Sequence, residues 1–180
     1  MKTYIGLLRG INVGGHRKIK MVDLKAMLNK MDLKDVITYI QSGNVVFKSS
    51  ITNTAQLEEK IKNGIVRTFG FDVPVLVKAY NELKCIFDKN PFTDTSDIEN
   101  KRIYFALSKE TPQPELIVAF RKDKFQGEQF IVAKDCVYLN YSIGAGKAKL
   151  SNNLIEQKLK VSATSRNYRT MSRLLEMAKK

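Results

Sequence analysis

The chain has 180 residues, of which 43% are hydrophobic and 27% charged, a composition typical of a globular protein and not of a disordered one. Lys and Arg outnumber Asp and Glu by 31 to 18, and the net charge of +13 favours polyanions, anionic metabolites or acidic surfaces as partners. No apolar stretch approaches the length of a membrane span, and the apolar run at residues 4–8 is too short for a signal peptide. We therefore expect a cytoplasmic protein that does not bind membranes.

The charge excess is concentrated at the two ends of the chain. Residues 1–34 contain 8 basic and 2 acidic side chains, residues 141–180 contain 9 and 2, and residues 35–140 contain 14 of each. The two cysteines, Cys85 and Cys136, lie far apart and lack the spacing of a metal site or a disulfide framework. We expect no metal and no cofactor.

The first half of the chain has the pattern strand, helix, strand, strand, helix, strand. An apolar run at 4–8 predicts a strand, residues 10–16 a glycine-rich loop, and Met and Leu at helical spacing in 21–31 a helix. Two strands at 36–40 and 45–47 are joined by a turn at 41–44, and a helix capped by Asn53 and an edge strand at 73–77 follow. This order is typical of a ferredoxin-like unit.

Much of the pattern recurs in the second half. A linking helix around 83–87 and a polar loop at 90–100 lead to a strand at 103–107 and a helix beginning at Thr111 and Pro112. A hairpin of 130–132 and 136–139, a helix capped by Asn153, a strand or turn at 161–164 and a helix at 168–178 complete the chain. We predict an α+β fold of two ferredoxin-like halves, 1–79 and a degenerate 101–180, duplicated, linked by 80–100 and carrying an extra C-terminal helix. Together they are expected to form one compact unit.

The predicted topology brings the loop and the turn of the first half together. The first strand of a ferredoxin-like sheet lies beside the third, so residues 10–16 and 41–44 open at the same end. Backbone amides and basic side chains there suit a small anionic or phosphorylated ligand. The candidate ligand-binding residues are Arg9, Gly10, Asn12, Gly14, Gly15, His16, Arg17, Gln41, Ser42, Gly43 and Asn44. The alternative is that the glycines only allow sharp turns and close packing.

Standard nucleotide motifs are absent from this loop. His16 and Arg17 stand where a phosphate loop needs Lys and Ser or Thr, and Asn12 stands where a dinucleotide loop needs glycine. His16 is the single histidine and Ser42 its candidate nucleophile partner, but no nucleophile motif surrounds Ser42 and no acidic residue is placed to orient the ring. No residue is predicted to be catalytic, and whether the protein is an enzyme stays open.

A second hypothesis places nucleic acid on the basic ends. Residues 144–151 form another glycine-rich segment, and the last helix adds arginines one turn apart. The candidate phosphate contacts are Lys147, Lys149, Arg166, Asn167, Arg169 and Arg173. Helix-turn-helix, zinc-finger and RRM-like aromatic motifs are missing, so binding would not depend on sequence. A solvated charged face, or an interaction module without a ligand, explains the same charges.

The two densest segments resemble a known family signature. Residues 8–15 (Leu-Arg-Gly-Ile-Asn-Val-Gly-Gly) and 38–47 (Thr-Tyr-Ile-Gln-Ser-Gly-Asn-Val-Val-Phe) look closely like the bacterial domain of unknown function 1697 family, and 144–151 and 166–170 resemble its later motifs. Ala148 departs from that pattern, because similar sequences commonly carry serine there. The resemblance implies a single-domain bacterial cytoplasmic protein with a duplicated α+β fold, and it implies no activity.

Overall fold

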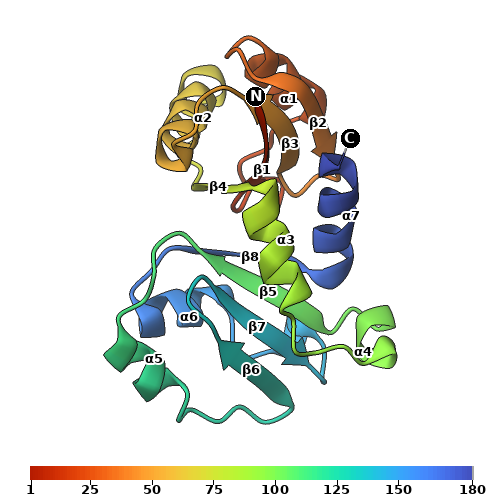
Figure 1. The fold of residues 1–180 in the computed structure, drawn as a ribbon, viewed down its shortest axis with the longest axis vertical. Helices are drawn as coiled ribbons and strands as arrows, with labels where there is room; N and C mark the ends of the chain where they lie inside the picture. Colours follow the sequence, from red (N-terminus) through yellow and green to blue (C-terminus); the bar gives the residue numbers. More distant parts are fainter. Residues whose placement is uncertain (180) are drawn as a thin grey trace. The chain divides into compact units, whose positions relative to one another are not determined.

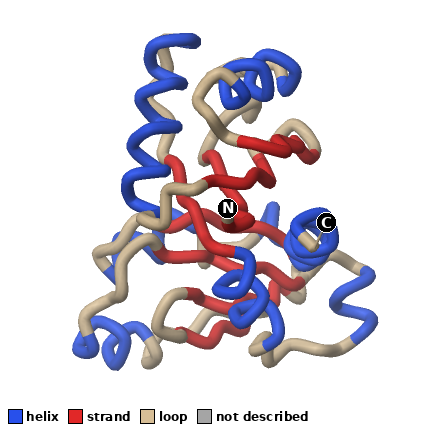
Figure 2. Tube along the Cα trace, turned by 45° about the horizontal axis from the view of Figure 1, so that its top comes forward, coloured by secondary structure: helices blue, strands red, loops and turns tan. Residues whose placement is uncertain are grey.

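The computed structural model describes residues 1–179, which form eight strands, seven α-helices and one 3-10 turn (Figure 1). They divide into two compact units, Met1–Cys85 with the residues from Arg173 on, and Ile86–Ser172. Each unit has its own four-stranded antiparallel sheet, whose strands run side by side in red in Figure 2. The chain is thus a mixed α+β protein. Over the same residues, every helix is too short or too polar to cross a bilayer.

The sheet of the first unit has the strand order β2-β3-β1-β4. Its elements in chain order are β1 (Lys2–Leu8), α1 (Met21–Asn29), β2 (Lys34–Tyr39), β3 (Asn44–Ser49), α2 (Thr54–Phe69), β4 (Val75–Ala79) and the start of α3 (Tyr80–Asp88). β4 is an edge strand, as predicted, and Pro74 directly precedes it.

The core of the first unit lies between one face of this sheet and the helices α1 and α2. Alternate residues of β1, Tyr4 and Leu8, pack in that core, and the ring of Tyr4 stacks on Phe47 of β3 with centroids 5.8 Å apart. Leu24 of α1 and Leu57 of α2 lie in the same cluster and are fully buried. These apolar contacts fix the sheet from which the glycine-rich loop emerges.

The second unit has the strand order β6-β7-β5-β8. Its elements are the end of α3, then α4 (Thr95–Glu99), β5 (Ile103–Ser108), α5 (Pro114–Phe120), β6 (Glu128–Val132), β7 (Cys136–Tyr141), the 3-10 turn η1 (Ala145–Lys147), α6 (Asn152–Leu159), β8 (Ala163–Asn167) and the start of α7 (Tyr168–Ala178). Phe120, Leu139 and Leu150 are central to its core.

Two predictions of local structure in the second unit are wrong. The polar segment 90–100 contains the short helix α4, because Asp94 caps it by accepting a hydrogen bond from Asp97 N at 3.0 Å. Helix α5 begins at Pro114 and not at Thr111 and Pro112, since Pro114 occupies its first turn, where a missing N–H costs nothing.

The predicted cap of α6 is also wrong. Ser151, not Asn153, is the N-cap, and its Oγ accepts from Leu154 N at 3.2 Å. Glu156, five residues after this cap, accepts through its Oε1 from Ala163 N at 2.8 Å. The strand that begins there, β8, extends three residues beyond the predicted end at Thr164, to Asn167. Three consecutive polar residues at 151–153 each suit a cap, so the pattern alone could not select one.

A polar network of the second unit around Asp97 leads to a prediction about how stability depends on pH. Asp97 accepts from Arg102 Nη1 at 3.0 Å and from Asn140 Nδ2 at 2.7 Å, and these bonds hold the pKa of Asp97 below its usual range. The stabilisation is therefore present above the ordinary carboxyl pKa and lost as pH falls through the lower, folded value. We expect Arg102→Met to raise the Asp97 pKa, measured by carboxyl NMR titration; an unchanged value would contradict this assignment.

Candidate functional site

The glycine-rich loop is an ordered hairpin between β1 and α1. His16 N donates to Val13 O at 3.1 Å, and Asn12 N donates to Arg17 O at 3.2 Å. Gly14 and Gly15, between Val13 and His16, have φ angles of 59° and 78°, as the two central residues of a type I′ turn do. The two glycines are therefore required by the turn.

Asn12 anchors this hairpin to the rest of the first unit. Its Oδ1 accepts from Ile19 N at 2.8 Å, and its Nδ2 donates to Ile19 O at 2.8 Å and to Gln41 O at 2.9 Å. The bond to Gln41 confirms the expected proximity of the loop and the turn at 41–44. The side-chain amide of Asn12 thus ties the base of the loop together, and both of its N–H groups are already engaged.

The facing turn is held by its own polar side chains. Asn44 is fully buried, and its Nδ2 donates to Tyr39 O at 3.1 Å and to Ser42 Oγ at 2.9 Å. Gly43 has a φ of 77°, and its carbonyl accepts from Leu8 N at 2.7 Å. Ser42 and Asn44 therefore stabilise the turn itself.

The tip of the loop presents basic side chains to solvent. Gly10, His16, Arg17, Lys18 and Lys20 are exposed, and Arg9 is half-buried. Val13 beside them is 62% exposed. The Arg17 side chain lies over Gly10, where an added Cβ would be 3.4 Å from Arg17 Nη1.

The last residue of the loop, a lysine, lies at the start of helix α1. Lys20 is the N-cap of α1 and makes no side-chain hydrogen bond to the first turn, so no side-chain oxygen caps these amides. The N-terminus of a helix has a partial positive charge, and a lysine there is electrostatically unfavourable. Asp23 in the first turn compensates in part. A bound anion would lower the electrostatic energy of this arrangement.

The second glycine-rich segment already binds an anionic group of the protein. The buried carboxylate of Glu128 accepts from Lys149 N at 2.7 Å and from Leu150 N at 2.8 Å. Glu128 thus occupies these two backbone amides, and an external anion at this segment would have to contact its side chains instead. The side chains of Lys147 and Lys149 themselves are exposed.

The remaining basic candidates have mixed environments. Asn167 Oδ1 accepts from Thr170 N at 2.9 Å, and the exposed Arg173 donates through Nη1 to Glu176 Oε2 at 3.0 Å. Burial lowers the pKa of Arg166 to about 10, and its Nη1 donates to Ser165 O at 2.9 Å. Arg169 is exposed. Asn167 and Arg166 thus have structural partners inside the protein.

The profile of a family described as Protein of unknown function (DUF1697) matches residues 1–138, more than half of the chain. The chain belongs to the DUF1697 family. The DUF1697 match includes the whole glycine-rich loop and the turn facing it, and stops before the basic segment at 144–151.

A solved structure shares the fold of this DUF1697 protein. It is described as conserved bacterial protein SP0830 from Streptococcus pneumoniae, with a TM-score of 0.76 and 24% sequence identity over 98% of each chain. At this identity the likeness establishes the fold alone. A search of curated proteins gave no significant match.

Loss of the Asn12 side chain is expected to destabilise the loop. Asn12→Gly removes three hydrogen bonds while tolerating the φ of 55°, and we expect a loss of about 2 kcal/mol in the free energy of unfolding. Urea denaturation measures it. Asp32→Gly is the matched control, because exposed Asp32 has a φ of 58° and its replacement relieves the same backbone strain. Equal effects of the two variants would show that the hydrogen bonds of Asn12 contribute nothing.

Proposed function

We propose that the loop between β1 and α1 binds an anionic or phosphorylated ligand. The second unit supports the proposal, because its matching connection indicates how few residues a strand-to-helix loop at this position needs. We infer that the units are duplicated ferredoxin-like repeats, with residues 1–79 and 101–180 as the two halves and 80–100 as the link. Both sheets have the order second, third, first, fourth strand, all antiparallel.

Backbone hydrogen bonds at the strand ends support this equivalence. Leu8, the last residue of β1, donates from its N–H to Gly43 O at 2.7 Å, and Ser108, the last residue of β5, donates to Asp135 O at 3.0 Å. Gly43 and Asp135 each directly precede the third strand of their sheet. The residues after Leu8 and Ser108 both donate to the residue before the fourth strand, at 2.9 Å in each unit.

Side chains repeat in the same way. Glu58 lies five residues after Asn53, the N-cap of α2, and Glu156 lies five residues after Ser151, the N-cap of α6. Glu58 Oε1 accepts from Val77 N of β4 at 2.9 Å, and Glu156 Oε1 accepts from Ala163 N of β8 at 2.8 Å. In both units a helix carboxylate therefore satisfies an N–H of the edge strand.

Because the two units match elsewhere, the loop between β1 and α1 differs clearly in length from its counterpart. Twelve residues, 9–20, join β1 to α1, whereas five residues, 109–113, join β5 to α5. The strand-to-helix connection thus needs fewer than half of the residues that the first unit uses. Longer ordered loops on a fixed scaffold commonly carry function. The extra residues form the anchored hairpin and include three cationic residues, Arg17, Lys18 and Lys20, just before the start of α1 in the chain.

The observation that carries the proposal is this placement of cations at a helix N-terminus that no side-chain oxygen caps. Backbone amides and the helix dipole attract negative charge there, and flexible Lys and Arg side chains add to the attraction. The open, solvent-exposed tip suits a phosphoryl group on the surface of a larger ligand. Ser42 and Asn44 contribute by holding the turn against which the loop is anchored.

Titration with pyrophosphate, followed by amide NMR, tests the proposal. We expect saturable shifts of Gly14, Gly15 and Lys18 N–H, and at least about tenfold weaker binding by Arg17→Ala with Lys18→Ala, because two cationic contacts are lost. Arg67→Ala is the matched control, an exposed arginine on α2 of the same unit. Equal weakening by the control, or no saturable shift, would overturn the proposal.

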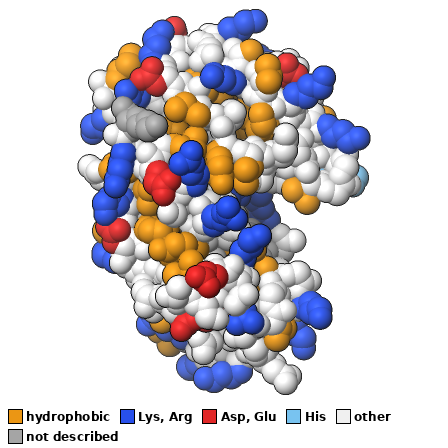
Figure 3. Space-filling model, turned by 90° about the vertical axis from the view of Figure 1, so that its right-hand side faces the viewer, with side chains coloured by type: hydrophobic (Ala, Val, Ile, Leu, Met, Phe, Trp, Pro, Cys, Tyr) orange, Lys and Arg blue, Asp and Glu red, His pale blue; other side chains and the backbone are white. Residues whose placement is uncertain are grey.

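Nucleic-acid binding is the competing proposal, and the exposed Lys147, Lys149 and Arg169 support it. Lys and Arg side chains outnumber Asp and Glu on the face seen in Figure 3, which fits a polyanionic partner. An oligonucleotide should bind with a steep salt dependence, weakened by Lys147→Ala with Lys149→Ala. Weakening by the loop variants instead would identify the oligonucleotide as a ligand of the loop.

A further inference from the structure

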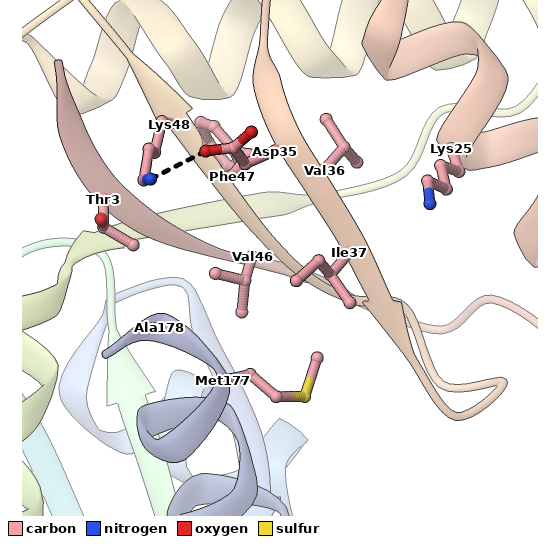
Figure 4. A pocket seen from close by; sticks show the side chains of 10 residues that line it. All are labelled: Thr3, Lys25, Asp35, Val36, Ile37, Val46, Phe47, Lys48, Met177 and Ala178. Carbon is pink, nitrogen blue, oxygen red and sulfur yellow. Dashed lines mark ion pairs between the residues drawn. The ribbon is translucent and has the colours of Figure 1, made fainter. Parts of the chain in front are cut away.

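A cavity of about 420 Å³ lies in the first unit, where β2 and β3 face the end of α7. Val36 and Phe47, which belong to the core with α1 and α2, line part of it, and their neighbours Ile37 and Val46 line it from the opposite face of the sheet. Figure 4 shows Ile37 of β2 and Val46 of β3 projecting toward Met177 near the end of α7. The cavity therefore has an apolar body between two strands and a helix.

Comparison with the second sheet shows why space remains here. Ile37 pairs with Val46 in the first sheet, and Ile131 pairs with Tyr138 at the matching register of the second. The Tyr138 ring is buried, packs edge-on against Phe105 at 5.7 Å and donates its hydroxyl hydrogen to Ile86 O at 2.9 Å. Valine is much smaller than tyrosine. The first sheet thus leaves room at the position that the second sheet fills with a ring.

One end of the cavity is polar and carries charge. Lys48 Nζ forms an ion pair with Asp35 Oδ2 at 2.7 Å, and Thr3 lies beside them on β1 (Figure 4). An ammonium group has three donors, of which this pair uses one. Lys25 of α1 lines the cavity away from this pair (Figure 4), so over the whole lining two ammonium groups stand against one carboxylate. The excess charge favours an anionic group on any ligand.

We propose that this cavity binds a single-chain aliphatic carboxylate. Its volume falls within the range of small-molecule sites, and an apolar lining with a few polar groups at one end is their usual composition. The chain lies along Ile37, Val46 and Met177, and the carboxylate accepts hydrogen bonds from Lys48 Nζ and from the Thr3 hydroxyl. This site is separate from the loop of the proposed function and does not depend on it.

Calorimetric titration of the full chain with octanoate tests the assignment. We expect 1:1 saturable binding, with octanol at least about tenfold weaker because it lacks the charge, and acetate undetectable because it lacks the chain. Lys48→Met is expected to remove the preference for octanoate over octanol. Equal affinity of octanoate and octanol for the unmodified protein would refute the role given to Lys48.

A pair of matched variants localises the binding. Ile37→Trp fills the cavity and should abolish octanoate binding, whereas Ile131→Trp changes the residue at the matching register of the second sheet and should not. The two isoleucines are 39% and 46% exposed, so either position can accept a larger ring at its surface. Loss of binding in both variants, or in neither, would overturn the proposal.

A measurement on the unmodified protein guards against misfolding of the variants. The methyl groups of the methionines are labelled with ¹³C, and Met177 is assigned with Met177→Leu. Octanoate should shift the Met177 methyl signal and leave that of Met171, a buried residue of the second unit on the same helix, unchanged. Equal shifts at both, or no shift at Met177, would contradict binding in this cavity.

Discussion

Gly43→Ala is expected to lower the free energy of unfolding of the first unit by about 3 kcal/mol. Two costs add up at this position. Gly43 has a φ of 77°, which L side chains rarely adopt, and an added Cβ would lie 2.6 Å from Leu8 Cβ and 2.9 Å from Ile11 Cδ1. Because Leu8 Cβ is fixed to the backbone of β1, relief requires a shift of the strand itself.

Gly70→Ala separates the two costs. Gly70 is the left-handed C-cap of α2 with a φ of 74°, and a Cβ added there would have nothing within 4 Å. It carries the backbone strain without the clash, so we expect a loss of only about 1 kcal/mol. Urea denaturation at constant m-value measures both variants. Equal losses would show that the turn relaxes away from β1 without cost.

Glu128→Ala is expected to destabilise the second unit by about 4 kcal/mol. The carboxylate accepts two hydrogen bonds, from Lys149 N and Leu150 N, and each bond to a charged group contributes roughly 2 kcal/mol. The variant leaves both N–H groups without this acceptor beside the core. Leu150 O also accepts from the Tyr141 hydroxyl at 2.7 Å, so the loss reaches the buried end of β7.

Two comparisons identify the cause of that loss. Glu128→Gln keeps one acceptor oxygen and should lose about half as much, whereas Gln129→Ala changes an exposed residue of the same strand and should have almost no effect. The Tyr141 pKa gives a second readout. Burial raises it first, and Glu128 and Tyr104 raise it further, so Glu128→Ala should lower the value in a spectroscopic titration. An unchanged Tyr141 pKa would contradict this contact.

Local patterns in the sequence were sufficient where one residue type had a single physical role. The sequence predicts Asn53 as the cap of α2, and its Oδ1 accepts from Ala55 N at 2.9 Å and from Gln56 N at 3.2 Å. The hairpin turn at 41–44 and the proximity of the loop to it followed from the order of the first six elements. Both depend on short-range spacing and on how strands pair in such a sheet, which the sequence encodes directly.

Other features depend on contacts between residues far apart in the chain. Nothing in the sequence near Glu128 indicates that its carboxylate binds two amides more than twenty residues later. The cavity beside Val46 likewise follows from the size of one side chain relative to its counterpart Tyr138, and requires the register of both sheets. Such features can be seen only in the tertiary structure, because each depends on a partner residue that the spacing of residues in the sequence does not identify.

The sequence predicts that the loop and the turn lie together at the candidate site. It does not predict which of their residues hold this local structure and which face solvent or a ligand. Judged by residue type and position in the sequence, Asn12, Ser42 and Asn44 belong with the basic residues as candidate ligand contacts. In the structure these three polar side chains hold the loop and the turn by internal hydrogen bonds. The exposed charges at Arg17 and Lys18 are left to interact with solvent or a ligand. Polar residue type alone does not distinguish an anchor from a contact.

Helix α7 begins in the second unit and ends in the first, with the boundary between Ser172 and Arg173. The first unit therefore contains residues from both ends of the described chain. During synthesis it cannot be completed when Cys85 leaves the ribosome, but must wait on the order of ten seconds for the helix to follow. Until then the cavity lined by Met177 and Ala178 lacks one wall. The order of translation thus makes the N-terminal unit the last to be finished.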